Sequence, residues 1–82
     1  MIDVKIAGPG CKNCEELASR VRAAIERLSI QATLVKVTDY KEIAALGILM
    51  TPGLVVDGKV LSQGKLPTEA TLESWLLRAA GR

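Results

Sequence analysis

Two cysteines separated by two residues stand where one hydrophobic pattern gives way to another. Before them, Ile2, Val4 and Ile6 alternate with less apolar residues, which is the period of a strand with one strongly apolar face. After them, apolar residues follow helical spacing for four turns: Cys14, Leu17, Ala18, Val21, Ala24, Ile25 and Leu28. The cysteine pair, in the stretch Gly8-Pro9-Gly10-Cys11-Lys12-Asn13-Cys14, therefore lies across a turn from strand to helix.

The start of a helix favours a thiolate, because the first backbone N–H groups lack intrahelical partners and the helix dipole is positive there. If Cys11 is the N-cap, its sulfur can accept from the N–H groups of Asn13 and Cys14, which lowers the thiol pKa below its reference of about 8.5. The flanking Gly8 and Gly10 can supply unusual backbone angles. A reactive dithiol is therefore one interpretation of this stretch.

A structural disulfide, a metal site and two inert core thiols are the alternatives. A loop this short constrains the unfolded chain very little, which argues against a structural disulfide. Cys14 alone could belong to the core, whereas Cys11 in a turn of proline and glycine is hard to bury.

The 82 residues predict one domain, residues 1–82, and 49% hydrophobic residues suffice for a compact core. No charged start precedes an apolar segment and no run approaches a membrane span, so we expect neither secretion nor membrane insertion. The expected compartment is the cytoplasm, where a lone cysteine pair is more often catalytic or metal-binding than structural. The net charge of only +2, with one Trp, one Tyr and no Phe, argues against nucleic-acid binding.

The next segments extend the pattern of strands and helices. We expect the first helix to end near Leu28-Ser29 and residues 30–37 to form a strand parallel to the first, with a right-handed crossover. Asp39 has the position of an N-cap for a short second helix that Gly47 ends.

The remaining segments predict a hairpin and a final helix. Asp57-Gly58 between two β-rich runs is a strong signal for a two-residue hairpin turn. A last helix follows from about Thr68, and Trp75 on its apolar stripe is interpreted as a core residue. The order is thus β-α-β-α-β-β-α.

With this order, the sequence resembles the thioredoxin/glutaredoxin superfamily, and within it the small thioredoxin-like proteins called redox-active disulfide proteins. The resemblance covers essentially the whole chain. It is carried by Gly8-x-Gly10-Cys11-x-x-Cys14, Met50-Thr51-Pro52, Val55-Val56-Asp57-Gly58-Lys59-Val60 and Gly64-Lys65-Leu66-Pro67. It implies an α/β fold with a four-stranded mixed sheet in the order 4-3-1-2, with the first and third helices on one face and the second on the other.

The resemblance also implies a substrate site beside the cysteines. The Thr51-Pro52 bond would be cis, its loop would lie against the cysteine pair, and the Thr51 backbone would pair with an extended substrate segment. Met50 and Pro9 would be apolar walls of this site.

Two lysines would tune the thiol pKa. Lys5 stands where typical thioredoxins have an acid six residues before the nucleophile, and Lys12 lies between the cysteines. As cations, both favour the thiolate. The acidic and glycine features with which many glutaredoxins hold glutathione are not evident after Val60.

The function that follows is that of a thiol-disulfide oxidoreductase, an electron carrier for cell redox homeostasis. Cys11 would attack a protein disulfide and Cys14 would resolve the mixed disulfide. No cofactor is expected besides the redox-active disulfide, and no metal. The expected partners are a disulfide-containing protein and a reductase of the thioredoxin-reductase type, and we expect a monomer that works on the reducing side.

The alternative is a copper(I)- or zinc(II)-binding domain, similar to a metal chaperone, that uses the same Cys-x-x-Cys. Such domains end on a strand, whereas this chain is predicted to end on the helix that carries Trp75. The sequence has no histidine and no third cysteine to complete a tetrahedral site.

Overall fold

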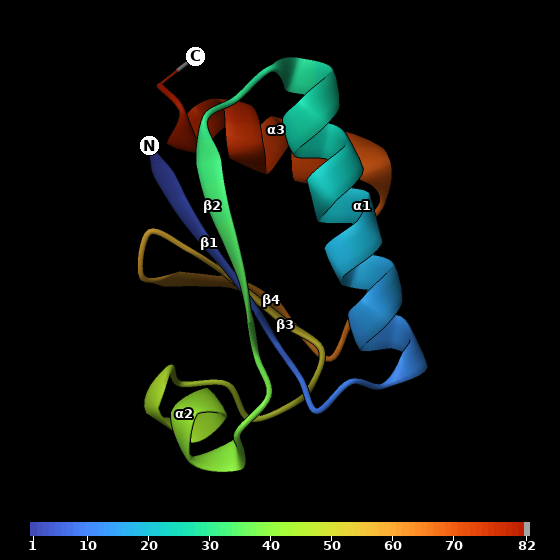
Figure 1. Cartoon of the computed structure of the whole chain (residues 1–82), viewed down its shortest axis with the longest axis vertical. Helices are drawn as coiled ribbons and strands as arrows, with labels where there is room; N and C mark the ends of the chain where they lie inside the picture. The colour runs from blue at the N-terminus through green and yellow to red at the C-terminus, as the bar shows by residue number, and fades with distance from the viewer. Residues whose placement is uncertain (82) are drawn as a thin grey trace.

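The computed structural model describes residues 1–81 and has the predicted order of elements (Figure 1). The strands and helices are β1 (Ile2–Ala7), α1 (Lys12–Leu28), β2 (Ala32–Val37), α2 (Tyr40–Ala45), β3 (Gly53–Val56), β4 (Lys59–Gln63) and α3 (Glu69–Ala79).

The strands form one mixed sheet in the order β2-β1-β3-β4, which confirms the predicted topology. β1 pairs in parallel with β2, from Ile2 opposite Ala32 onward, and α1 provides the crossover that a parallel pair requires. β3 pairs antiparallel with both β1 and β4. Leu61 of β4 is an extra residue at a β-bulge, because the register shifts between Leu54 and Val55.

Each face of the sheet carries its own hydrophobic cluster, and β3 is buried on both faces. The larger cluster joins the sheet to α1 and α3, and the smaller one joins it to α2, so the helices lie on the predicted faces. The larger cluster contains Ile2, Val4, Ile6, Leu17, Ala18, Val21, Ala24, Ile30, Leu54, Val56, Leu72 and Leu76. The smaller contains Ala7, Val37, Ile43, Ile48 and Val55.

The hairpin between β3 and β4 has the predicted turn. Asp57 and Gly58 both have positive φ, at 49° and 82°, as a type I′ turn requires. The Asp57 carboxylate accepts from the backbone N–H of Asp3 at 2.9 Å, and the Asp57 N–H donates to the Asp3 carbonyl at 2.8 Å. These two bonds fix the turn against β1.

Trp75 differs from the expectation for a core residue. Its α3 neighbours Leu72 and Leu76 are fully buried, whereas Trp75 is only partly buried and lines a groove beside β4. Trp75 packs against the larger cluster and remains partly exposed.

The register of the sheet determines where the cysteine pair lies. Ala7 at the end of β1 is opposite Gly53 at the start of β3, so the turn into α1 and the loop before β3 meet at one end of the sheet. Among the described residues, no helix combines the length and the apolar character that a membrane crossing needs.

Candidate active site

Cys11 is the N-cap of α1. Its backbone is extended, with φ −68° and ψ 166°, and its sulfur accepts from the N–H of Cys14 at 3.2 Å. The sulfur thus satisfies one of the free donors of the first turn, at the positive end of the helix dipole.

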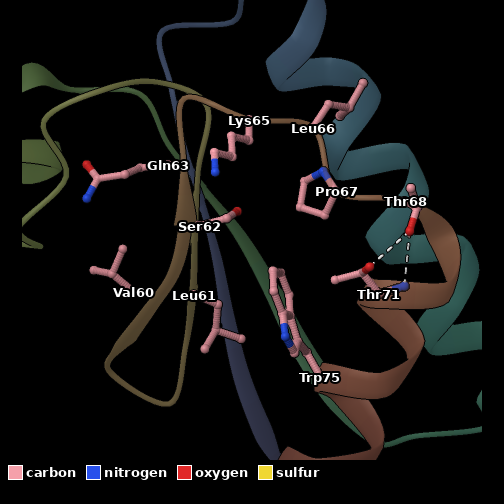
Figure 2. A pocket seen from close by; sticks show the side chains of 10 residues that line it. All are labelled: Val60, Leu61, Ser62, Gln63, Lys65, Leu66, Pro67, Thr68, Thr71 and Trp75. Atoms are coloured by element: carbon pink, nitrogen blue, oxygen red, sulfur yellow. Dashed lines mark hydrogen bonds between the residues drawn. The ribbon is translucent and has the colours of Figure 1, made fainter.

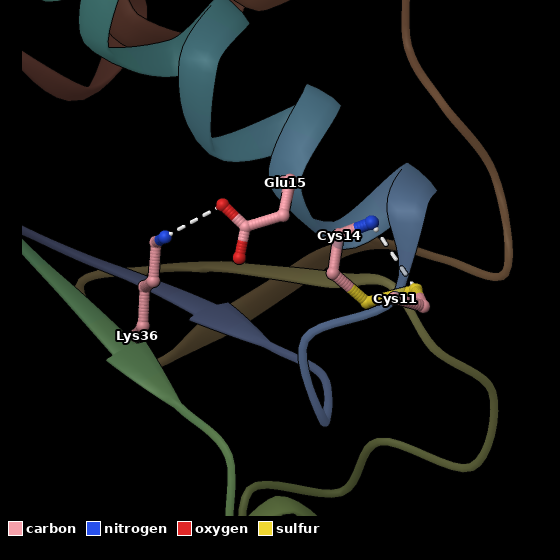
Figure 3. Close-up of a disulfide and its surroundings, with 4 residues drawn as sticks. All are labelled: Cys11, Cys14, Glu15 and Lys36. Atoms are coloured by element: carbon pink, nitrogen blue, oxygen red, sulfur yellow. Dashed lines mark hydrogen bonds and ion pairs between the residues drawn. A yellow bond between two sulfur atoms is a disulfide. The ribbon is translucent and has the colours of Figure 1, made fainter.

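Cys11 and Cys14 form a disulfide across this first turn, with their Cα atoms 5.0 Å apart (Figure 3). The two residues differ in exposure: Cys14 is 4% exposed and begins the buried stripe of α1, whereas Cys11 is exposed. Cys11 is therefore open to solvent, and Cys14 is shielded by the protein.

Gly8 leaves the space that the Cys14 sulfur occupies. A Cβ atom on Gly8 would overlap that sulfur, and it would lie 3.7 Å from the Cβ atom of Thr51. Gly8, Cys14 and Thr51 therefore meet at one point. The expected unusual backbone angle is found at Gly10, with φ 96°, whereas Gly8 has a different role, a close approach between the turn and the helix.

The Thr51-Pro52 bond is cis, the conformation that the resemblance implies. Pro52 is buried and Thr51 is exposed beside the cysteines. The end of β4 holds this loop: the Gln63 side-chain oxygen accepts from Leu49 N–H at 2.7 Å and from Met50 N–H at 3.3 Å. The Gly64 N–H donates to the Pro52 carbonyl at 2.9 Å.

Sequence reasoning missed Gln63, because the atoms that it holds are thirteen and fourteen residues away and no local pattern marks such a contact. It also missed Leu49, which is 89% exposed. The unbroken apolar run before Pro52 was the available signal for Leu49. Leu49 belongs to the loop that faces the cysteine pair, and Gln63 holds that loop from the end of β4.

Met50 and Pro9 are the residues predicted to form apolar walls of a substrate site. Met50 is 61% exposed and Pro9 is also exposed. Met50 lies against Gly64, where an added Cβ would come within 3.0 Å of its side chain. The exposed apolar surface therefore includes the loop before Pro52 and the turn before Cys11.

The charged residues that are close to the cysteines in sequence lie in different parts of the structure. Lys5 lies on the sheet face that carries α2, because it alternates with the β1 residues that face α1, and its amine is 3.9 Å from the Asp3 carboxylate. Lys12 is exposed in the first turn of α1 itself. Glu15, the residue after Cys14, pairs with Lys36 of β2 at 2.9 Å (Figure 3).

The donor set for a metal ion is small. Within residues 1–81, no group of three or more His, Cys, Asp or Glu side chains is placed to hold an ion. Among the described residues, the cysteine pair would therefore offer a metal ion two ligands of these types, the sulfurs of Cys11 and Cys14. A structural zinc site uses four ligands.

The family model and the relatives that match this chain all belong to the thioredoxin family. A family model described as a thioredoxin domain matches residues 2–77. A protein named thioredoxin from Methanocaldococcus jannaschii is 40% identical over 68 residues, which are 83% of this chain and 78% of that protein. Another protein of that name, from Methanothermobacter thermautotrophicus, is 32% identical over 76 residues, which are 93% of this chain and 99% of that protein.

Proposed function

This chain belongs to the thioredoxin domain family and is a thiol-disulfide oxidoreductase, and from that premise we propose that Cys11 attacks a protein disulfide and Cys14 resolves it. The observation that carries the assignment of roles is the asymmetry of the pair. Cys11 is exposed at the helix start, whereas Cys14 is 4% exposed behind it.

The exchange proceeds in two steps that transfer two electrons to the substrate. The Cys11 thiolate attacks one substrate sulfur, so that a mixed disulfide forms, the substrate S–S bond breaks and one substrate thiolate leaves. Cys14 then loses its proton and attacks the Cys11 sulfur, which expels the second substrate thiolate. The product within the protein is the Cys11–Cys14 disulfide that the structure contains.

Thr51 and Pro52 would align the substrate for this attack. The exposed Thr51 lies at the point where Gly8 and Cys14 meet, so a substrate segment paired with its backbone would bring a disulfide to Cys11. Met50 and Pro9 would contact the apolar side chains of that segment.

Disulfide-containing proteins and a reductase are the partners that membership of the thioredoxin family implies. We expect the reductase to be of the thioredoxin-reductase type and to return two electrons to the Cys11–Cys14 disulfide. The proposed compartment is the cytoplasm, where thiols are kept reduced and a dithiol carrier would find this supply of electrons.

The proposed direction is reduction of the substrate. In the disulfide, the Cys11 sulfur accepts from one backbone N–H at 3.2 Å, and the same single donor in the reduced form would stabilise the thiolate only modestly. A strongly oxidising pair needs a strongly stabilised reduced form. The equilibrium potential of the pair, measured against a glutathione buffer, should be about −270 mV, as for a reductant, and a value of about −120 mV would contradict this direction.

A further inference from the structure

A groove lies between β4 and α3, on the free edge of the sheet. β4 is the last strand in the order β2-β1-β3-β4, so one of its edges has no strand beside it. The groove has a volume of about 620 Å³, and four successive residues of β4 form one wall (Figure 2). The opposite wall consists of the start of α3, with Thr68 and Thr71, and of Trp75.

The groove is apolar at its centre. Figure 2 shows Trp75 extending from α3 toward Leu61 and Ser62 of β4, below Pro67. A second hollow of about 370 Å³ also contains Leu61 and Trp75 and continues toward the hairpin turn. Trp75 is therefore accessible from both hollows, which together run along β4.

The rim of these hollows is positively charged. Lys65 lines the first hollow, and Lys59 and Arg78 line the second. Within residues 1–81, none of these three cations has an ion-pair partner. The one carboxylate of the lining, Asp57, accepts from the backbone of Asp3. An acidic occupant would therefore be attracted to this rim.

A polar atom in the groove wall also lacks a partner. Among the described residues, the Ser62 hydroxyl is the buried side-chain polar atom that makes no hydrogen bond. In Figure 2 its side chain points from β4 toward α3. The free edge and this hydroxyl are polar features beside an apolar floor, a combination that suits an extended peptide.

The groove is connected to the active site through the end of β4. Gln63, the last residue of β4, holds Leu49 and Met50, and Gly64 holds Pro52. A segment that lies along β4 therefore ends beside the loop that faces the cysteines.

We propose that this groove binds an extended acidic segment of the disulfide-containing substrate, laid along the free edge of β4. The proposal rests on the proposed function for the identity of the partner, and it adds a specificity-determining surface to the Thr51 contact. Apolar side chains of the segment would contact Trp75 and Leu61, and its carboxylates would pair with Lys59, Lys65 and Arg78.

Trp75 provides the readout, because it is the only tryptophan of the chain. The probe is a capped, cysteine-free peptide of eight alternating valine and glutamate residues, and the comparison is the same peptide with lysine in place of glutamate. The acidic peptide should change Trp75 fluorescence in a saturable way and bind more weakly at higher ionic strength. It should also slow hydrogen exchange of β4 amides. Equal binding of both peptides, or no binding, would overturn the proposal.

Charge reversal locates the site. The double variant Lys59→Glu/Arg78→Glu should weaken binding of the acidic peptide by about tenfold, because two attractions become repulsions. The control Arg22→Glu/Lys41→Glu reverses the same number of charges at exposed positions of α1 and α2, and it should bind like the unchanged protein. Equal losses in both variants would contradict a site beside β4.

Exchange kinetics test the docking of an acidic segment separately from the disulfide-exchange activity. With a disulfide peptide that carries an acidic flank, Lys59→Glu/Arg78→Glu should raise KM and leave kcat unchanged. With hydroxyethyl disulfide, which has no flank, the variant should match the unchanged protein. Normal KM for the acidic substrate would show that the cations only keep the sheet edge from pairing, and the docking proposal would be wrong although exchange is intact. No exchange by the unchanged protein would instead contradict the proposed function.

Discussion

At the scale of single residues, the cysteine pair needs one exposed sulfur and one shielded sulfur, and different neighbours provide each. Cys11 receives the N–H of Cys14 at the helix start. Cys14 fits because Gly8 has no side chain. The carboxylate of Glu15 would oppose a nearby thiolate, but Lys36 at 2.9 Å offsets part of its charge.

Gly8→Ala should displace the Cys14 sulfur. The added methyl overlaps that sulfur, and overpacking of this kind costs about 1–3 kcal/mol of unfolding free energy. We expect denaturant unfolding to show this loss and the resolving step of exchange to slow. Gly53→Ala is the matched control, since its methyl would come 2.6 Å from Ile48 in the cluster beneath α2. It should lose stability without slowing resolution, and equal slowing in both variants would contradict the role of Gly8.

The two lysines assigned to pKa tuning should differ in effect. Lys12 lies in the first turn of α1, whereas Lys5 is on the opposite face of the sheet from α1 and pairs with Asp3. Removal of a nearby cation raises the pKa of a thiol. Lys12→Gln should therefore move the pH profile of Cys11 alkylation to higher pH, and Lys5→Gln should move it less. A larger shift in Lys5→Gln than in Lys12→Gln would contradict this order, because it would show that the charge of Lys5 acts on Cys11 more strongly from across the sheet.

At the scale of elements, polar contacts hold α1 against α3 and its preceding loop. Arg27 of α1 donates to one Glu73 oxygen from two nitrogens, at 2.9 and 2.5 Å. Arg20 of α1 donates to the carbonyl of Pro67 at 3.0 Å, just before α3 begins. These contacts fix the wall of the groove that carries Trp75.

The contact between Arg27 and Glu73 should couple the two helices. In a double-mutant cycle with Arg27→Ala and Glu73→Ala, we expect a coupling energy of about 0.2–1 kcal/mol that falls with added salt, because both side chains are partly exposed. The pair Glu16 and Arg20 within α1 is the control, with an expected coupling of about 0.3–0.5 kcal/mol. A coupling near zero for Arg27 and Glu73 would mean that apolar packing alone joins the helices.

The elements were predictable from sequence where a local pattern defines them. Alternation marked β1, helical spacing marked α1, and Asp57-Gly58 marked the hairpin. The contacts that complete the site connect distant residues, such as Gln63 with Leu49, and periodicity carries no information about them. Trp75 followed the apolar spacing of α3, but the spacing could not show that β4 leaves part of its ring uncovered.

At the scale of the whole molecule, one sheet separates two hydrophobic clusters, and β3 contributes to both of them. Leu54 and Val56 face α1 and α3, whereas Val55 faces α2. If β3 unfolds, both clusters lose part of their core. The two faces of the sheet should therefore not unfold independently.

Unfolding should therefore be a single transition of one monomeric domain. Trp75 fluorescence reports the face of α3, and far-UV circular dichroism reports all helices and strands, so the two denaturation curves should coincide. Sedimentation should give a mass near 8.7 kDa. Separate transitions would contradict the single domain, and a doubled mass would contradict the monomer.

Trapping of the mixed disulfide tests the central claim most directly. Each single-cysteine variant, in reduced form, is incubated with an oxidised protein substrate and its intact mass is measured. Cys14→Ser should accumulate a covalent adduct through Cys11, because the resolving thiol is gone, whereas Cys11→Ser should form almost none, because Cys14 is shielded. Adducts in equal yield from both variants, or none from Cys14→Ser, would contradict exchange through an attacking Cys11 and a resolving Cys14.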